Sequence, residues 1–265
     1  MIFDVSTTRQ HAISHDPLHH LRDNYHCVIC FALQYAAGTT GDALVERWGL
    51  VPGRLLTEDS KEEKLMVNRS TVIATPYGDQ MIQSQRPVFP AAVSDWFTLI
   101  SCMFLHGGVM HLAGNMWFLH IFGDNVEDRL GHVGYALMYL TAGLAAGATH
   151  LFSDPRSLIP TIGASGAIAG VMGAYIVLHP KAVVEAIIPL PFVFGSFLVP
   201  APVFLGIWFA IQIFQGASSD RSSGVAWWAH VGGFVAGVVW AVMVRAIHYN
   251  HRPLVERHVA RRLWS

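Results

Sequence analysis

The sequence predicts an all-α polytopic membrane protein, a bundle of six transmembrane helices with a long loop between helices one and two. Composition gives the first indication, because 52% of the 265 residues are hydrophobic and only 13% are charged, against roughly 25% charged in soluble domains. The positions of the charges give the second. They cluster at residues 42–69, 124–129 and 245–262 and leave long charge-poor stretches between them, as expected of helices that meet lipid.

Six apolar segments are the candidate spans. They run over about residues 25–37, 109–122, 133–152, 162–178, 201–217 and 225–246. The first has only about 13 residues, whereas a helix needs roughly 20 to cross the hydrocarbon core, so whether it crosses the membrane stays open. The segments divide the chain into a polar N-terminal tail at 1–24, a membrane domain at 25–246 and a basic tail at 247–265.

Two connecting segments have features of their own. Residues 183–199 are apolar, but prolines interrupt them and Gly195-Ser196 indicates a turn, so we expect a hairpin loop, with a seventh span as the alternative. The loop at 38–108 ends in an apolar run that contains Trp96 and Phe97. Aromatic rings favour the level of the lipid headgroups, and the loop is therefore expected to be partly interfacial; a buried aromatic pair is the alternative.

Arginines indicate the orientation of the bundle. The chain after residue 244 carries five of them, the densest basic cluster beside any span, and basic residues next to spans favour the cytoplasm. With six spans both termini are then cytoplasmic, in a protein of the cell (inner) membrane. Spans two, four and six would begin at the outer face.

Composition and spacing argue against several classes of function. A formal charge of −1, with no basic run before the C-terminal tail, gives no electrostatic footprint for nucleic acid. The three cysteines do not make a disulfide framework, and Cys27 and Cys30 lack the βαβ context of a redox motif. His106, His111 and His120 do not share one helical face, and no HExxH occurs. We expect no cofactor and no metal.

Two polar residues stand out inside the candidate spans. Ser165 lies in a Gly-Ala-Ser-Gly run near the start of the fourth span, and His230 lies near the start of the sixth. A polar side chain in hydrocarbon costs free energy unless it has a partner or a function. At 1.5 Å per residue, Ser165 and His230 would lie roughly 5 and 8 Å into their spans. They are therefore expected at similar depth, just below the outer surface.

These residue types suit acyl transfer by serine. A serine hydroxyl attacks a carbonyl when a base lies within hydrogen-bond reach, and His230 is the candidate base for Ser165. The oxyanion that forms needs preorganised donors. Candidate donors are the backbone around Gly163 and Ser165 and the side chains of His111 and Asn115, which share one helix face at i, i+4.

Small residues predict how the serine and the histidine could meet. Four glycines of the fourth span can face two glycines of the sixth, and small residues let membrane helices approach closely. These are Gly163, Gly166, Gly170 and Gly173, opposite Gly233 and Gly237. From spacing alone a second interpretation stays open, because serine in a glycine-rich helix is commonly a packing residue and a lone membrane histidine is commonly structural.

Four ordered motifs resemble the rhomboid family of intramembrane serine proteases, in its bacterial form, over about residues 48–244. They are His106-Gly-Gly-Val-Met-His111 followed by Asn115, Gly123-x-x-x-Glu127-x-x-x-Gly131, Gly163-Ala-Ser165-Gly166, and Ala-His230 with Gly233 and Gly237. The resemblance implies a six-helix rhomboid-like bundle that cleaves transmembrane segments of membrane proteins near the outer face.

By the same resemblance, Ser165 is the nucleophile, His230 is its general base without a third acid, and His111 and Asn115 are the side-chain part of the oxyanion hole. His106 and Glu127 match the family pattern as residues that hold the loop and the helix end. Two alternatives are a catalytically inactive relative that acts in binding or quality control, and a small transporter, although the spans lack the paired charges of a transporter.

One position departs from the family pattern. Some members carry an aromatic ring four residues after the serine, where it stacks on the histidine, and this chain has Ala169. The residue that orients His230 is therefore open, with Trp227, Trp228 and Phe234 as candidates for packing against it.

Overall fold

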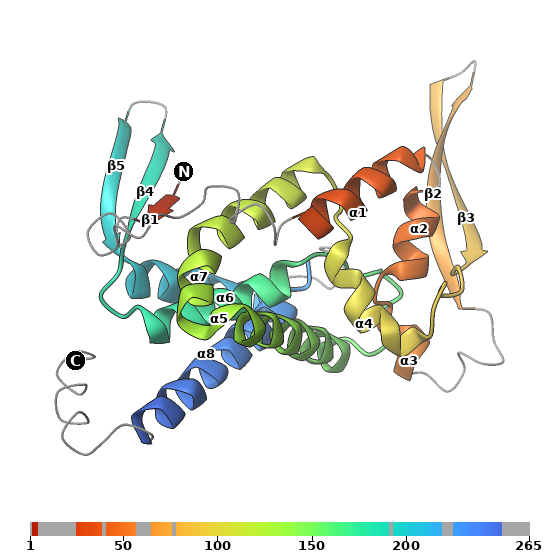
Figure 1. Cartoon of the computed structure of the whole chain (residues 1–265). Helices are drawn as coiled ribbons and strands as arrows, with labels where there is room; N and C mark the ends of the chain where they lie inside the picture. The colour runs from red at the N-terminus through yellow and green to blue at the C-terminus, as the bar shows by residue number, and fades with distance from the viewer. Residues whose placement is uncertain are drawn as a thin grey trace.

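The computed structural model describes residues 2–4, 25–38, 41–56, 65–75, 78–190, 193–218 and 225–250, and this part of the chain is mostly helical. Most of the predicted N-terminal tail and most of the basic tail lie outside the described residues. Figure 1 shows the longer helices gathered in one bundle, with a β-hairpin standing out on either side of it.

Helices occupy all six candidate spans. They are α1 (Tyr25–Ala36), α5 (Val109–Ser153), α6 (Ser165–Leu178), α7 (Ala201–Ser218) and α8 (Trp227–Asn250). α5 covers two of the spans, because Gly131 interrupts it with a φ of 70°, a left-handed conformation that glycine adopts without steric cost. The two halves of α5 therefore belong to separate predicted spans.

Length and hydropathy qualify fewer of these helices as membrane spans. Among the described residues α7 and the stretch Trp227–Ile247 of α8 qualify, and the bent pair Asp95–Phe104 with α5 makes up to three. α1 and α6 are apolar but shorter. The chain is thus a membrane protein with apolar helices, and the count of six spans stays a prediction.

Two β-hairpins depart from the all-α expectation. β2 (Met66–Thr75) and β3 (Gly78–Pro87) pair in antiparallel fashion inside the predicted loop at 38–108. β4 (Val183–Leu190) and β5 (Val193–Pro200) pair between α6 and α7, and β1 (Ile2–Asp4) adds a third strand beside β4. The all-α description is wrong for these segments, whose backbone groups form sheet ladders.

The hairpin predicted at 183–199 is present, but the predicted turn at Gly195-Ser196 is wrong. Gly195 pairs with Ile188 inside the ladder, and the strands reverse between Leu190 and Val193. That reversal pairs all 8 residues of each strand, whereas a turn at Gly195-Ser196 would leave a much shorter second strand. The longer ladder satisfies more backbone donors and acceptors than the Gly-Ser turn would.

Five short helices flank the β2–β3 hairpin in the described part of the chain, two before it and three between it and α5. They are α2 (Gly41–Trp48), α3 (Pro52–Leu56), η4 (Asp95–Phe97), α4 (Thr98–Ser101) and η5 (Cys102–Phe104). Trp96 and Phe97 are exposed on η4. Their exposure excludes the buried aromatic pair and is consistent with an interfacial position.

Buried polar contacts hold these short helices together. Arg54 donates to the backbone carbonyl oxygen of Glu46 at 2.7 Å and lies 3.5 Å from the carboxylate of Asp95. The Glu46 carboxylate forms an ion pair with Arg86. Burial raises the pKa of the Glu46 carboxyl, but hydrogen bonds and the charges of Arg86 and Arg54 outweigh it and bring the pKa below its usual value. An ionised Glu46 therefore ties the β3 end of the hairpin to α2.

The closest helix contact in the bundle joins α6 and α8. A Cβ added at Gly233 would lie 2.0 Å from the carbonyl oxygen of Gly166, and one added at Gly237 would lie 1.8 Å from that of Gly170. Side chains larger than hydrogen cannot fit at either α8 position without moving a helix. The predicted small-residue interface is confirmed for these pairs, which are the ones that bring the two backbones together.

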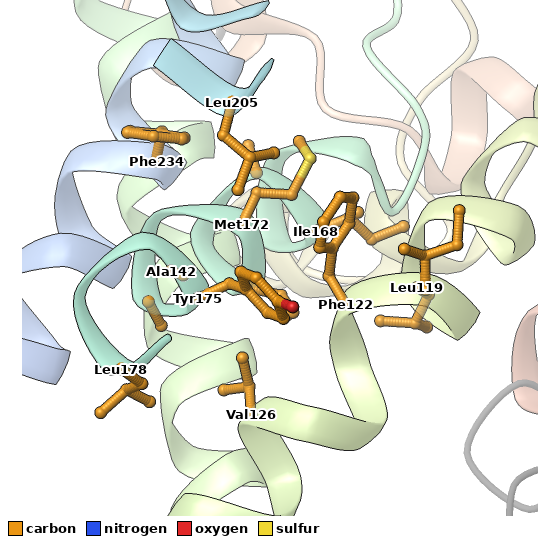
Figure 2. Close-up of a cluster of buried hydrophobic side chains, with 14 of the residues drawn as sticks. Leu119, Phe122, Val126, Ala142, Ile168, Met172, Tyr175, Leu178, Leu205 and Phe234 are labelled. Atoms are coloured by element: carbon orange, nitrogen blue, oxygen red, sulfur yellow. The ribbon is translucent and has the colours of Figure 1, made fainter. Parts of the chain in front are cut away.

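A hydrophobic core fills the space between α5, α6 and α7, as Figure 2 shows. Phe122 and Tyr175 meet edge to face with ring centroids 5.0 Å apart, a favourable aromatic geometry. Leu205 of α7 is fully buried in the same cluster. The core fixes α5 against α6 and anchors one end of α7 to both.

Candidate active site

Ser165 and His230 meet at the ends of two adjacent helices. The Nε2 atom of His230 lies 2.8 Å from the Oγ atom of Ser165. Ser165 is the first residue of α6 and His230 lies in the first turn of α8. Ser165 therefore lies nearer its helix end than the predicted depth of roughly 5 Å, because α6 begins later than the apolar segment does.

The preceding loop places Ser165 by backbone hydrogen bonds. Leu50 and Thr161 exchange both of their backbone bonds, at 3.0 and 2.8 Å, and the N–H of Gly163 donates to the carbonyl oxygen of Cys102 at 2.9 Å. Gly163 has a φ of 124°, which other residues rarely adopt. The chain can therefore turn into α6 with the serine at the corner.

Gly163 also leaves room for a histidine. A Cβ at this position would lie 2.9 Å from the ring of His111 and 3.7 Å from the Oγ atom of Ser165. The ring of His111 and the serine hydroxyl thus flank the same Cα atom. The Gly163 N–H already donates to Cys102 and is therefore not a donor for the site. Gly163 contributes the space for the His111 ring and the turn of the chain into α6.

Residues from α7 hold the far side of His230. The Nδ1 atom of His230 lies 2.8 Å from the Oε1 atom of Gln212, a buried side chain. The ring of Trp208 lies 6.0 Å from the imidazole, tilted by 36°, and Trp227 of α8 meets it edge-on at 6.1 Å. Of the packing candidates, Trp227 contacts the histidine, and the sequence interpretation missed Gln212 and Trp208. An amide inside an otherwise apolar span was the available signal.

His111 has a defined hydrogen-bonding role. Its Nδ1 atom accepts a hydrogen bond from the N–H of Gly107 at 3.2 Å. A neutral imidazole that accepts at one nitrogen carries its proton on the other, so Nε2 of His111 is a donor. That nitrogen lies 2.9 Å from where a Cβ of Gly163 would be, and the Oγ atom of Ser165 lies 3.7 Å from the same point.

Asn115 presents a donor without an acceptor. Its side-chain nitrogen is buried and has no hydrogen-bond partner among the described residues, and the residue is 8% exposed. An unsatisfied buried donor costs about 1–3 kcal/mol. Such a group is expected where an acceptor arrives during function.

One cavity connects these groups. It has a volume of about 590 Å³, and its walls include His111, Asn115, Gly163, Ser165 and His230. Most of its remaining walls are apolar or glycine, among them Trp208. The site is thus a largely apolar cavity whose walls carry a hydroxyl, an imidazole and two side-chain donors.

The residues predicted for structural roles lie both near this cavity and away from it. Gly166 and Gly233 form the α6–α8 contact directly below the dyad, and Gly237 continues it one turn further. His106 is fully buried, with its ring 5.3 Å from that of His111. Glu127 contacts His132 across the helix break at Gly131. His106 thus packs behind the donor histidine, while Glu127 serves a helix end away from the site.

Among the described residues, the candidate metal ligands do not gather into one group. No group of three or more His, Cys, Asp or Glu side chains there could hold an ion. His106 precedes α5 and lies beside His111 without a third candidate ligand. The three cysteines are free thiols.

Comparison with known proteins shows the family to which the chain is similar. The family model described as the rhomboid domain matches residues 93–247. Rhomboid-like protein 11, chloroplastic, of Arabidopsis thaliana is 30% identical over 155 residues, 57% of this chain and 52% of that protein. Rhomboid protease GluP of Bacillus subtilis is 31% identical over 148 residues, 55% of this chain and 25% of the relative. The chain spans about half of the first of these relatives and a quarter of the second.

Proposed function

The chain belongs to the rhomboid family, and from this premise we propose that it is an intramembrane serine endopeptidase. Ser165 is the nucleophile and His230 the general base. The observation that carries the proposal is the 2.8 Å contact between His230 Nε2 and Ser165 Oγ, made inside a cavity large enough for a short stretch of extended peptide. A packing serine and a structural histidine would not need that cavity.

The contact supports a two-step acyl transfer. Ser165 Oγ attacks the scissile carbonyl carbon while its proton passes to His230 Nε2, and the imidazolium then gives that proton to the leaving amine. Water subsequently attacks the acyl-serine, with His230 again as the base. No other protein group has to gain or lose a proton in this sequence.

Three donors support an oxyanion hole. They are the side-chain nitrogen of Asn115, Nε2–H of His111 and the backbone N–H of Ser165, which as the first residue of α6 has no acceptor within its own helix. An oxyanion would satisfy the buried nitrogen of Asn115. Each such donor is worth about 3 kcal/mol in a transition state.

The proposed substrates are transmembrane segments of membrane proteins, cut near the outer face. α5, α6 and α8 all begin around the dyad, and in the proposed six-span topology with cytoplasmic termini these beginnings face outward. A helical substrate hides its carbonyl groups in backbone hydrogen bonds and must unwind before attack. Gly, Pro or other small residues near the outer end would lower that cost.

Labelling by a fluorophosphonate probe tests the proposal. The native chain should be labelled and should cleave a membrane-spanning substrate, and Ser165→Ala should lose both properties completely while staying folded in the membrane. Ser153→Ala is the matched control, because its hydroxyl donates to a carbonyl oxygen at the end of α5 and lies outside the cavity walls. A native chain that neither reacts nor cleaves would favour the inactive rhomboid-like alternative, and cleavage by Ser165→Ala would refute the assignment.

A further inference from the structure

We propose that Gln212 is a positioning residue that selects the tautomer of His230 and holds its ring toward Ser165. The inference rests on the proposed function, in which His230 is the base, and adds a third residue to a site otherwise described as a pair. Gln212 touches the histidine and not the serine. It therefore acts through His230.

Two hydrogen bonds fix the orientation of the Gln212 amide. Its Nε2 atom donates to the carbonyl oxygen of Trp208 on its own helix at 3.3 Å, and its Oε1 atom lies 2.8 Å from His230 Nδ1. The nitrogen end cannot accept a hydrogen bond. With the amide nitrogen engaged by a carbonyl, the oxygen end faces the imidazole, and His230 Nδ1 must be the donor.

That assignment sets the state of the catalytic nitrogen. In a neutral imidazole only one nitrogen carries a proton, so a protonated Nδ1 leaves the lone pair of Nε2 free to receive the proton of Ser165 Oγ. When that proton arrives, His230 carries hydrogen on both nitrogens. Nδ1–H then donates to Gln212 from a charged ring, and hydrogen bonds to charged groups are stronger than neutral ones. Gln212 thus favours the protonated histidine as the reaction proceeds.

The burial of the Gln212 side chain indicates that its amide has a specific function. Its side chain is 5% exposed, and a buried amide costs free energy unless it is hydrogen-bonded. An apolar side chain at this place in α7 would avoid the cost altogether. The amide is bonded across to α8, so the bond exists only while α7 lies against α8.

The test compares Gln212→Met with Gln215→Met. Methionine has nearly the volume of glutamine without its acceptor, and Gln215 lies on the same helix outside the cavity walls. Gln212→Met should lower kcat by roughly 10- to 100-fold, the size expected for one hydrogen bond to a charged group, with KM within about twofold. Gln215→Met should leave both constants near native. A kcat for Gln212→Met within twofold of native would overturn the proposal.

A second measurement does not depend on activity. In protein labelled with ¹⁵N-histidine, the His230 signals, assigned by their loss in His230→Ala, should indicate a proton on Nδ1 and none on Nε2, and Gln212→Met should shift the population toward the other tautomer. An Nε2-protonated ring in the native chain would refute the inference even if proteolysis is established. Conversely, a native chain that no serine-directed probe labels would end the proposed function, while this spectrum still decides the role of Gln212.

Gln212→Glu covers the case in which the methionine variant does not fold. It keeps an oxygen acceptor at the same reach, so kcat should stay within about tenfold of native and the Nδ1-protonated tautomer should persist. A folded Gln212→Glu protein with the opposite tautomer would show that the acceptor is not what orients His230.

Discussion

Two of the helices that pack against α8, α6 and α7, contact it in different ways. Toward α6 it presents glycines, and Gly233 and Gly237 lie against carbonyl oxygens of the α6 backbone. Toward α7 it presents side chains, with Phe234 stacked on Phe209 at 4.3 Å and His230 bonded to Gln212. One interface is backbone against backbone, and the other depends on a few rings and one amide.

Because the α6–α8 and α7–α8 interfaces differ, the residues of the site are held with different rigidity. Backbone contact of the α6–α8 kind has no side chain that can adjust, so Ser165 and His230 are fixed relative to one another. Side-chain contacts of the α7–α8 kind can be weakened one at a time. α7 also supplies Trp208 to the cavity wall, so the part of the site that is most easily changed is the wall and the support behind His230.

Breaking the α6–α8 interface should have the largest effect. In Gly237→Ala a new Cβ would lie 1.8 Å from the carbonyl oxygen of Gly170, so the helices must separate. Overpacking of this kind costs roughly 1–3 kcal/mol or more. We expect a strongly lowered midpoint of thermal unfolding in detergent, together with loss of probe labelling at Ser165.

Gly206→Ala provides the matched control for that prediction. A Cβ at Gly206 on α7 meets no atom within 4 Å, and alanine favours helix over glycine by about 1 kcal/mol. The midpoint should stay level or rise. Equal losses in the two variants would mean that α7 is packed as tightly as α6, against the comparison above.

Truncating the Asn115 side chain should have the next largest effect, which should appear in kcat and not in stability. Asn115→Ala removes a buried nitrogen that has no hydrogen-bond partner within the described part of the chain, so folding should lose little, while the transition state loses a donor. We expect kcat to fall roughly 10- to 1000-fold with little change in KM.

Asn125→Ala on the same helix is the control for Asn115, because its side chain donates to Ile121 within α5 and lies outside the cavity walls. Its kcat should stay near native. An unchanged kcat in Asn115→Ala would leave the oxyanion to His111 and the backbone.

The sequence predicted the part of the site on α6 and α8 better than the part supplied by α7. Motif and spacing identify Ser165, His230 and the glycines of the α6–α8 contact. A small-residue interface requires small residues at a regular spacing in both helices, which the sequence shows directly. The start of α6 at Ser165 was missed, since hydropathy does not register the positive φ of Gly163 that ends the loop.

The support from α7 could not be derived in the same way. Gln212 stands out as an amide in a mostly apolar helix, but its partner depends on how α7 rotates against α8, which the α7 sequence does not specify. The position of the β4–β5 turn was missed for a related reason. Local Gly-Ser chemistry indicated one turn, while the pairing of two whole strands decided another.

The smallest effect is expected where α7 meets α8 through rings. Phe209→Leu removes a stacked pair with Phe234, worth about 0.5–1.5 kcal/mol, and the fold should persist because Leu205 still anchors α7 in the core. Thermal unfolding should therefore show a slightly lower midpoint, well short of the Gly237→Ala loss.

Phe214→Leu, the same change at a ring that is 68% exposed on α7, should leave the midpoint unchanged. If Phe209→Leu destabilised the protein as much as Gly237→Ala, the α7–α8 contact would have to be counted among the fixed interfaces, and movement of α7 away from His230 would require partial unfolding.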